Sequence, residues 1–210
     1  ATNARFALVS AGSSELNNIQ SLKCNKFDNI QKAISFYLST MEDTKIHSAC
    51  FATAGTVHLD TFKLANNHWT INKSEVASVL KDVDINWIND FTAQALATTT
   101  LTDSDVAVIN KGIAKPEKLR LVIGPGTGLG VCGLVMTKSG WVPIAGEGGH
   151  SDFAPNTKLE FEILTLLTKK FGHVAVERIL SGPGILNLYE ALCQINGVDT
   201  IFKSPSDITA

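Results

Sequence analysis

Residues 119–136 read LRLVIGPGTGLGVCGLVM and combine two apolar runs with a glycine-rich turn between them. The first run, Leu119–Ile123, predicts a strand, and the second, Val131–Met136, predicts its hairpin partner. Glycine lets a backbone come close to an anion, so exposed N–H groups and the Thr127 hydroxyl in this turn are suited to phosphate oxygens. The segment therefore predicts a strand–turn–strand unit that binds phosphate.

Other interpretations of this turn compete with a phosphate-binding hairpin. Gly128, Gly130 and Gly133 match the bare spacing of a dinucleotide-binding fingerprint, but that motif requires a helix directly after the turn, where we expect a strand. A P-loop is excluded because no Gly-Lys-Ser/Thr follows. A plain tight hairpin with no ligand is the simplest alternative and stays open.

The composition indicates a folded globular protein. Of the 210 residues, 44% are hydrophobic and 18% are charged, with a net charge of −2, so a core can form and no basic surface for nucleic acid is evident. The longest nearly apolar stretch, residues 122–136, is interrupted by glycines and is too short to span a membrane. Four widely spaced cysteines without a Cys-x-x-Cys pair favour reduced thiols in a cytoplasmic protein.

Strands and helices alternate in the first half of the chain and helices dominate the second, which is typical of an α/β fold. Strands are also expected at residues 5–10, 19–26, 46–53 and 85–88. Helices are expected at residues 27–41, 73–80, 92–99, 174–180 and 183–193, with a further helix after a capping box formed by Thr157 and Glu160. We expect a small lobe over residues 1–100 and part of a larger lobe over residues 101–210. Because the chain starts without Met and ends where a helix begins, we expect both ends to be boundaries within a longer protein.

Asn89-Asp90 follows the apolar segment Ile85–Ile88, and ligands in α/β sheets bind at the carboxyl ends of strands. A carboxylate there can accept a proton from a hydroxyl group, which phosphoryl transfer to an alcohol requires. Asp90 or Thr92 can equally serve as a simple cap for the following helix. The sequence pattern alone does not separate the two roles.

The segment Gly146–His150, GEGGH, is a second glycine-rich turn and carries Glu147 and His150. A carboxylate and an imidazole match vicinal sugar hydroxyls, because one accepts hydrogen bonds and the other can donate or accept. A zinc site would need further ligands and lacks a His-x-x-x-His pair. A glycosidase pair of Asp90 with Glu147 is conceivable, but it leaves the phosphate-type turn unexplained.

Two other polar pairs have simpler explanations. Glu177-Arg178 is expected on a short helix before Ser181–Gly184, where an exposed ion pair accounts for it. His68-Trp69 could stack on a sugar, although a core tryptophan beside a turn is the simpler interpretation.

Taken together and in this order, these segments resemble the bacterial glucokinase family. The matching segments cover nearly the whole chain: Thr2–Arg5, Ile88–Ala93, Gly124–Gly130, Gly146–His150 with Asp152–Pro155, and Gly172-His173 through Glu177-Arg178 to Gly184. The cysteine-rich zinc motif of the related repressor/kinase family of sugar kinases is absent from the sequence.

The resemblance implies an α/β fold of the ribonuclease H-like type, shared with actin and hexokinase, with two lobes of which the second is incomplete here. It implies ATP-dependent phosphorylation of glucose at the 6-hydroxyl, with Mg²⁺ accompanying ATP and with Asp90 as the general base. The remaining implied roles are glucose binding by Asn89, Glu147, His150 and Glu177, and binding of the nucleotide phosphates by Thr2, Gly126, Thr127 and Gly128. No protein ligand to a metal is assigned, and no nucleic acid or membrane partner is expected. The oligomeric state is left open, with a homodimer as one option.

The sequence departs from the family pattern at its start. The family's first phosphate loop, Asp-x-Gly-Gly-Thr, is represented only by Ala1-Thr2, with Ala1 at the position of the second glycine. The family's adenosine-binding segment has no counterpart in the chain. A sugar-binding or regulatory module without turnover is therefore the alternative function.

Overall fold

The computed structural model describes residues 2–41, 44–54, 57–64, 67–113, 115 and 118–209. The chain divides into two compact units, Ala1–Asn110 and Lys111–Ala210, and each unit has its own cluster of buried apolar side chains. The expected lobes at residues 1–100 and 101–210 stay a prediction about domain organisation.

The described residues of the first unit form three small two-stranded sheets. The antiparallel pair joins β1 (Asn3–Val9) to β2 (Leu16–Lys23), and the parallel pair joins β3 (Ser48–Thr53) to β6 (Asp84–Asn89). A short hairpin joins β4 (Thr61–Lys63) to β5 (Thr70–Asn72). The parallel register runs to the last residue of β6, pairing Thr53 with Asn89, so the polar end of this strand lies at the carboxyl edge of its sheet.

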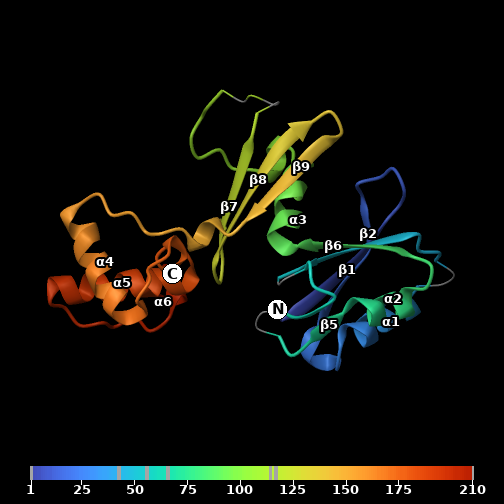
Figure 1. Ribbon diagram of the computed structural model, residues 1–210, viewed down its shortest axis with the longest axis horizontal. Helices are drawn as coiled ribbons and strands as arrows, with labels where there is room; N and C mark the ends of the chain where they lie inside the picture. The colour runs from blue at the N-terminus through green and yellow to red at the C-terminus, as the bar shows by residue number, and fades with distance from the viewer. Residues whose placement is uncertain are drawn as a thin grey trace. The chain divides into compact units, whose positions relative to one another are not determined.

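The helices of the first unit begin at polar caps. Asn29 caps α1 (Ile30–Ser39) and Asn72 caps α2 (Lys73–Leu80), because each side chain accepts a backbone N–H three residues later. Helix α3 (Asp90–Ala97) follows β6 directly (Figure 1). Trp69 is 2% exposed, and its Nε1–H donates to the Phe27 carbonyl at 2.9 Å. This indole is therefore part of the core, and the structure does not support the sugar-stacking interpretation.

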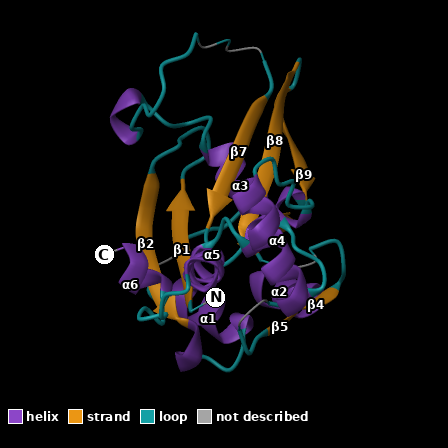
Figure 2. Ribbon diagram, turned by 90° about the vertical axis from the view of Figure 1, so that its left-hand side faces the viewer, coloured by secondary structure: helices purple, strands orange, loops and turns teal. Residues whose placement is uncertain are grey.

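The second unit contains a three-stranded antiparallel sheet of β7 (Arg120–Pro125), β8 (Leu129–Thr137) and β9 (Gly140–Gly146). The three strands lie side by side in Figures 1 and 2. The β7–β8 register pairs Pro125 with Leu129, so the hairpin turn consists of residues 126–128. The expected strand–turn–strand unit is confirmed, and the dinucleotide fingerprint is wrong because a strand follows the turn.

The two faces of this sheet differ in burial. On one face Cys132 and Leu134 are buried, since they are 1% and 0% exposed. Because Gly133 pairs with Leu121 on one side and Ile144 on the other, these residues share the opposite face. That face carries four aliphatic side chains that are 45–61% exposed, Leu121, Ile123, Val142 and Ile144.

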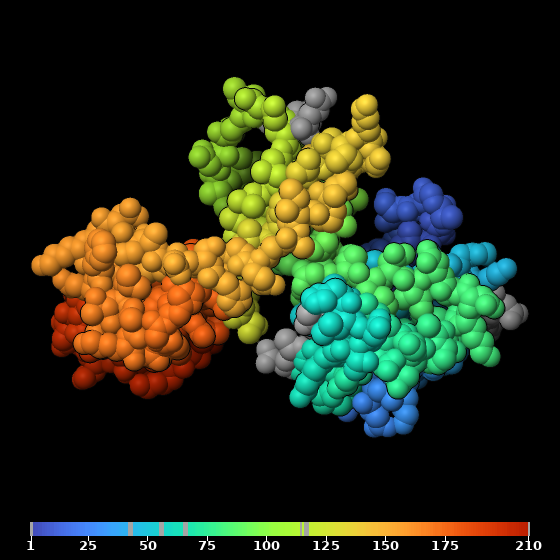
Figure 3. Space-filling model, in the orientation of Figure 1, coloured from blue at the N-terminus to red at the C-terminus, as the bar shows by residue number. Residues whose placement is uncertain are grey.

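Helices follow the sheet in the second unit. Thr157 caps α4 (Lys158–Phe171), and the expected capping box with Glu160 is confirmed. Ser181 caps α5 (Gly182–Asn196), which ends at Gly197 in the left-handed conformation, and α6 (Pro205–Thr209) comes last. Helices α4 and α5 pack around a cluster of buried aliphatic side chains and form one block, orange to red in Figure 3.

Some expected boundaries differ from the structure. Residues 174–180 do not form the predicted helix and contain only a 3-10 turn, η4 (Val176–Arg178), because Ala175 is held in a bridge to Asp152. The strand expected at residues 19–26 ends at Lys23 and continues as a 3-10 turn, η1 (Cys24–Lys26). Gly55, which follows the strand expected at residues 46–53, lies outside the described residues, as does Ala1.

Candidate functional site

Asn89 and Asp90 lie at the junction of β6 and α3. The Asn89 Oδ1 accepts hydrogen bonds from the N–H groups of Phe91 (2.9 Å) and Thr92 (3.1 Å), which makes Asn89 the helix cap. The capping role considered for Asp90 therefore falls to its neighbour. The exposed Asp90 carboxylate accepts the Phe91 N–H through Oδ1 at 2.9 Å, and its Oδ2 can still accept a proton from a hydroxyl group.

Thr2 lies just before β1 in the same unit. Its carbonyl accepts a hydrogen bond from the Cys24 N–H at 3.0 Å, which ties the start of β1 to the end of β2. The residue is exposed. Its part in phosphate binding stays a prediction.

The glycine turn of the second unit is closed by two backbone hydrogen bonds. The Gly126 N–H donates to the Gly128 carbonyl at 2.8 Å, and the Gly126 carbonyl accepts the N–H of Gly182 at 2.8 Å. Because the Gly126 N–H is used within the turn, the N–H groups of Thr127 and Gly128 and the Thr127 hydroxyl are the donors that can reach a phosphate. The turn is thus anchored to the first residue of α5.

The second glycine-rich turn packs against the start of β8. It contains η3 (Gly148–His150), and a Cβ atom on Gly149 would lie 2.1 Å from the Leu129 carbonyl oxygen. A Cβ atom on Gly148 would meet the Val131 side chain at 2.9 Å. Glycine is therefore needed at both positions because the turn lies directly on the strand that leaves the phosphate turn.

Glu147, His150 and Glu177 come together in the second unit. The His150 Nε2 lies 3.9 Å from the Glu147 Oε2, and the His150 Nδ1 lies 3.8 Å from the Glu177 Oε1. Glu177 is the most enclosed of the three, with 22% of its side chain exposed against 62% for His150 and 87% for Glu147. Two carboxylates that flank one imidazole provide acceptors and a switchable donor within a few ångströms, which suits adjacent sugar hydroxyls.

Backbone pairing aligns the segments that carry His150 and Glu177. The Phe153 N–H donates to the Val174 carbonyl at 3.0 Å, and the Val176 N–H donates to the Ser151 carbonyl at 2.9 Å. A side-chain contact of 2.5 Å between His173 Nε2 and Asp152 Oδ1 lies beside this pairing. Sequence reasoning found no role for His173, and only the structure reveals its partner.

Ser181 fixes the end of the Glu177 segment. Its hydroxyl donates to the Glu177 carbonyl at 2.7 Å and accepts the Gly184 N–H at 3.0 Å, so it caps α5 and holds the preceding turn. Arg178 does not pair with Glu177 as a surface ion pair would. Its guanidinium instead lies 4.6 Å from the centre of the Phe171 ring.

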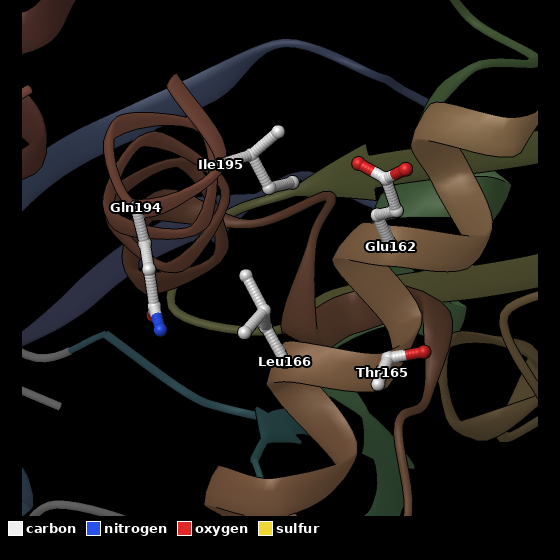
Figure 4. Close-up of a pocket in the computed structure, with 5 residues that line it drawn as sticks. All are labelled: Glu162, Thr165, Leu166, Gln194 and Ile195. Atoms are coloured by element: carbon white, nitrogen blue, oxygen red, sulfur yellow. The ribbon is translucent and has the colours of Figure 1, made fainter. Parts of the chain in front are cut away.

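A groove of about 330 Å³ lies away from these residues, between α4 and α5 (Figure 4). Its lining residues are Glu162, Thr165 and Leu166 from α4 and Gln194 and Ile195 from α5. None of the candidate site residues contributes to it. Its few polar groups do not form a recognisable ligand set, so we assign it no ligand.

No described helix has both the length and the apolar character needed to cross a membrane. The described part of the chain also has no group of three or more His, Cys, Asp or Glu side chains placed to hold a metal ion.

Solved structures define the class of protein. The crystal structure of glucokinase from an Antarctic psychrotroph matches with a TM-score of 0.88 and 34% identity, covering 100% of this chain and 66% of that one. Glucokinase from Balamuthia mandrillaris, solved in complex with glucose, shares the fold, with a TM-score of 0.66 and 20% identity over 99% of this chain and 65% of that one. The expected ribonuclease H-like α/β fold is confirmed.

Sequence comparison gives the family. The glucokinase family model matches residues 1–210. The glucokinase of Hahella chejuensis is 48% identical over 208 residues, which are 99% of this chain and 65% of that protein. The glucokinase of Marinobacter nauticus is 43% identical over 209 residues, again 65% of its length. The chain belongs to the glucokinase family and spans about 65% of the length of these relatives.

Proposed function

We propose that the protein represented by this chain transfers the terminal phosphoryl group of ATP to the 6-hydroxyl of glucose. The observation that carries the sugar half of the proposal is the cluster of Glu147, His150 and Glu177. Family membership supports ATP as the donor. The glycine turn supports phosphate binding through Thr127 and Gly128, whose N–H groups can face an anion.

Asp90 is the proposed general base. Its neighbour Asn89 caps α3, so the Asp90 carboxylate is not needed as the cap and can accept the proton of the attacking hydroxyl. The Asn89 Nδ2 remains a donor for a sugar oxygen while its Oδ1 caps the helix. The proton moves from the sugar hydroxyl to Asp90 as that oxygen bonds to phosphorus and the bond from phosphorus to the nucleoside diphosphate breaks.

We propose that Mg²⁺ binds together with ATP. When bound with ATP it neutralises charge on the phosphate oxygens. We assign the ion to the phosphate oxygens of the nucleotide and name no protein ligand for it. Thr2 is proposed to contribute to phosphate binding from the start of β1.

The cellular setting follows from the same chemistry. All four cysteines are free in the structure, which supports a reducing, cytoplasmic location. A homodimer stays a prediction about the assembled protein.

The test is steady-state phosphorylation of glucose by the complete protein with ATP and Mg²⁺. We expect Asp90→Asn to lower kcat by about 10³-fold, because the amide keeps the hydrogen bond with the Phe91 N–H but cannot accept a proton. The matched control is Asp84→Asn, at the other end of the same strand, which should turn over at the wild-type rate. Full activity of Asp90→Asn would show that another group is the base. Glucose binding by a wild-type protein without turnover would favour the sugar-binding module.

A further inference from the structure

Glu177 has two carboxylate oxygens with different neighbours. Its Oε1 lies 3.8 Å from the His150 Nδ1, in the proposed sugar site. Its Oε2 accepts a long hydrogen bond, 3.4 Å, from the N–H of Leu129, the first residue after the phosphate turn. One side chain thus contacts both the sugar residues and the turn.

The carboxylate lies directly against the turn. A Cβ atom on Gly128 would come within 2.8 Å of the Glu177 Oε2, so the space where a side chain would stand is filled by this oxygen. The Glu177 backbone is held there by the Ser181 hydroxyl, and the Gly126 carbonyl is bound by the Gly182 N–H. These bonds hold the Glu177 backbone next to the turn, while the carboxylate can still turn about its own side-chain bonds.

A negative charge in this position opposes binding of a phosphate. The turn presents the N–H groups of Thr127 and Gly128 to an anion, and the carboxylate lies beside them, bound to the N–H of the next residue, Leu129. It also repels phosphate oxygens over a few ångströms, an effect that a partly enclosed site screens less than bulk water does. With 22% of its side chain exposed, Glu177 lies in such a site.

We propose that Glu177 is an internal competitor for the phosphate turn, and that sugar binding removes it. This inference rests on the proposed function, because sugar hydroxyls must bind the Glu177 carboxylate and move it toward His150. Release of the Leu129 N–H and withdrawal of the charge then raise the affinity for the nucleotide. By thermodynamic linkage the nucleotide raises the affinity for glucose by the same factor.

The size of the effect follows from the charge. For one unit charge about 5 Å from a phosphate charge, the change in affinity is about fourfold at the dielectric constant of water and more than about 100-fold at an effective value of about 20, so we expect a change of at least about fourfold and on the order of tenfold in nucleotide affinity. Saturating glucose should therefore tighten binding of a non-hydrolysable ATP analogue with Mg²⁺ by about tenfold.

The deciding experiment is calorimetric titration of the complete protein with that analogue in the absence of sugar. Glu177→Gln keeps the shape of the side chain and removes its charge, so it should bind the analogue about tenfold more tightly than wild type. The charge-matched control is Glu162→Gln, in α4 beside Lys158 and outside the candidate site, which should stay within about twofold of wild type.

The direction of this change separates a competitor from a structural support. If Glu177 only supported the turn, Glu177→Gln would bind the analogue more weakly, and that result would overturn the proposal. Equal affinity of wild type and variant would overturn it too. The variant is first checked to have the Tm of wild type. A shift of the Leu129 amide signal in its nuclear magnetic resonance spectrum, relative to wild type, then verifies that the contact with residue 177 has been altered. The titration contains no sugar, so it tests the competitor role of Glu177 independently of glucose binding. Failure of the protein to bind glucose would contradict the proposed function but not the competition between Glu177 and phosphate.

Discussion

Gly149→Ala is expected to destabilise the second unit strongly. The new Cβ atom would stand 2.1 Å from the Leu129 carbonyl oxygen and 2.9 Å from the Leu129 Cβ. Unstrained contacts between carbon and a carbonyl oxygen start at about 3.3 Å, so about 1.2 Å of overlap must be relieved. The obstacle is backbone of β8 rather than the flexible end of a side chain, and relief therefore requires the turn or the strand to move.

The cost should lie at the upper end of the range for overpacking, about 3 kcal/mol. For a unit of about 100 residues, that loss lowers Tm by roughly 12–24 °C. Gly146→Ala is the matched control, because its Cβ atom would meet no atom within 4 Å. We expect the control to change the free energy of unfolding by less than about 0.5 kcal/mol.

The assay is unfolding in urea, monitored by hydrogen exchange in the peptides that cover β8. These peptides report on the second unit alone and not on residues 1–110. The Gly149→Ala protein should lose exchange protection at a much lower urea concentration than Gly146→Ala. Coincident midpoints for the two variants would refute the argument, because they would mean that the close approach to Leu129 is relieved without cost.

Two further predictions concern the cap of α4 and the core of the first unit. The backbone N–H groups of Asn156 and then Thr157 lower the pKa of Glu160 below its usual value of about 4.3. The ionised carboxylate therefore stabilises the fold above that pH, and this stabilisation should disappear as the pH falls through the lowered pKa. Wild type and Glu160→Gln should accordingly differ in Tm at pH 7 and have the same Tm at low pH. A difference in Tm that stays constant with pH would contradict the assignment. Trp69→Phe should lose about 1–2 kcal/mol in urea unfolding, because the indole N–H no longer reaches the Phe27 carbonyl and part of the buried volume is lost. An unchanged midpoint would show that the indole hydrogen bond contributes nothing.

Local patterns predicted the elements whose own residues determine their structure. Helix α2 (Lys73–Leu80) has the bounds expected for it, ends at its last apolar residue, and follows its Asn72 cap directly. The hairpin β7–β8 follows from two apolar runs around a glycine turn, and the α4 capping box follows from the spacing of Thr157 and Glu160. In each case the decisive contacts join residues a few positions apart.

Other elements depend on partners far away in the chain. Residues 174–180 have a helical pattern, but pairing of Ala175 with Asp152 keeps the start of the segment extended, so tertiary contacts override the local preference. The hairpin β4–β5 has only three residues in each strand, too few for a clear alternation.

The candidate site shows the same division. The glycine turns and the carboxylate at the end of β6 are visible in the sequence because their chemistry is local. The contacts of Glu177 with His150 and with the Leu129 N–H join residues 27 and 48 positions apart, which no spacing rule predicts. The choice of Asn89 rather than Asp90 as the cap also required the hydrogen bonds themselves.

The hydrogen bond from Gly182 to Gly126 has a consequence for the order of folding during synthesis. The hairpin β7–β8 can form as soon as its own residues leave the ribosome, but the carbonyl at its tip waits for a donor more than fifty residues further along the chain. At usual rates of translation that delay lasts roughly 3–11 s. During this interval the phosphate turn exists without its anchor, so it reaches its final shape only when α5 has emerged.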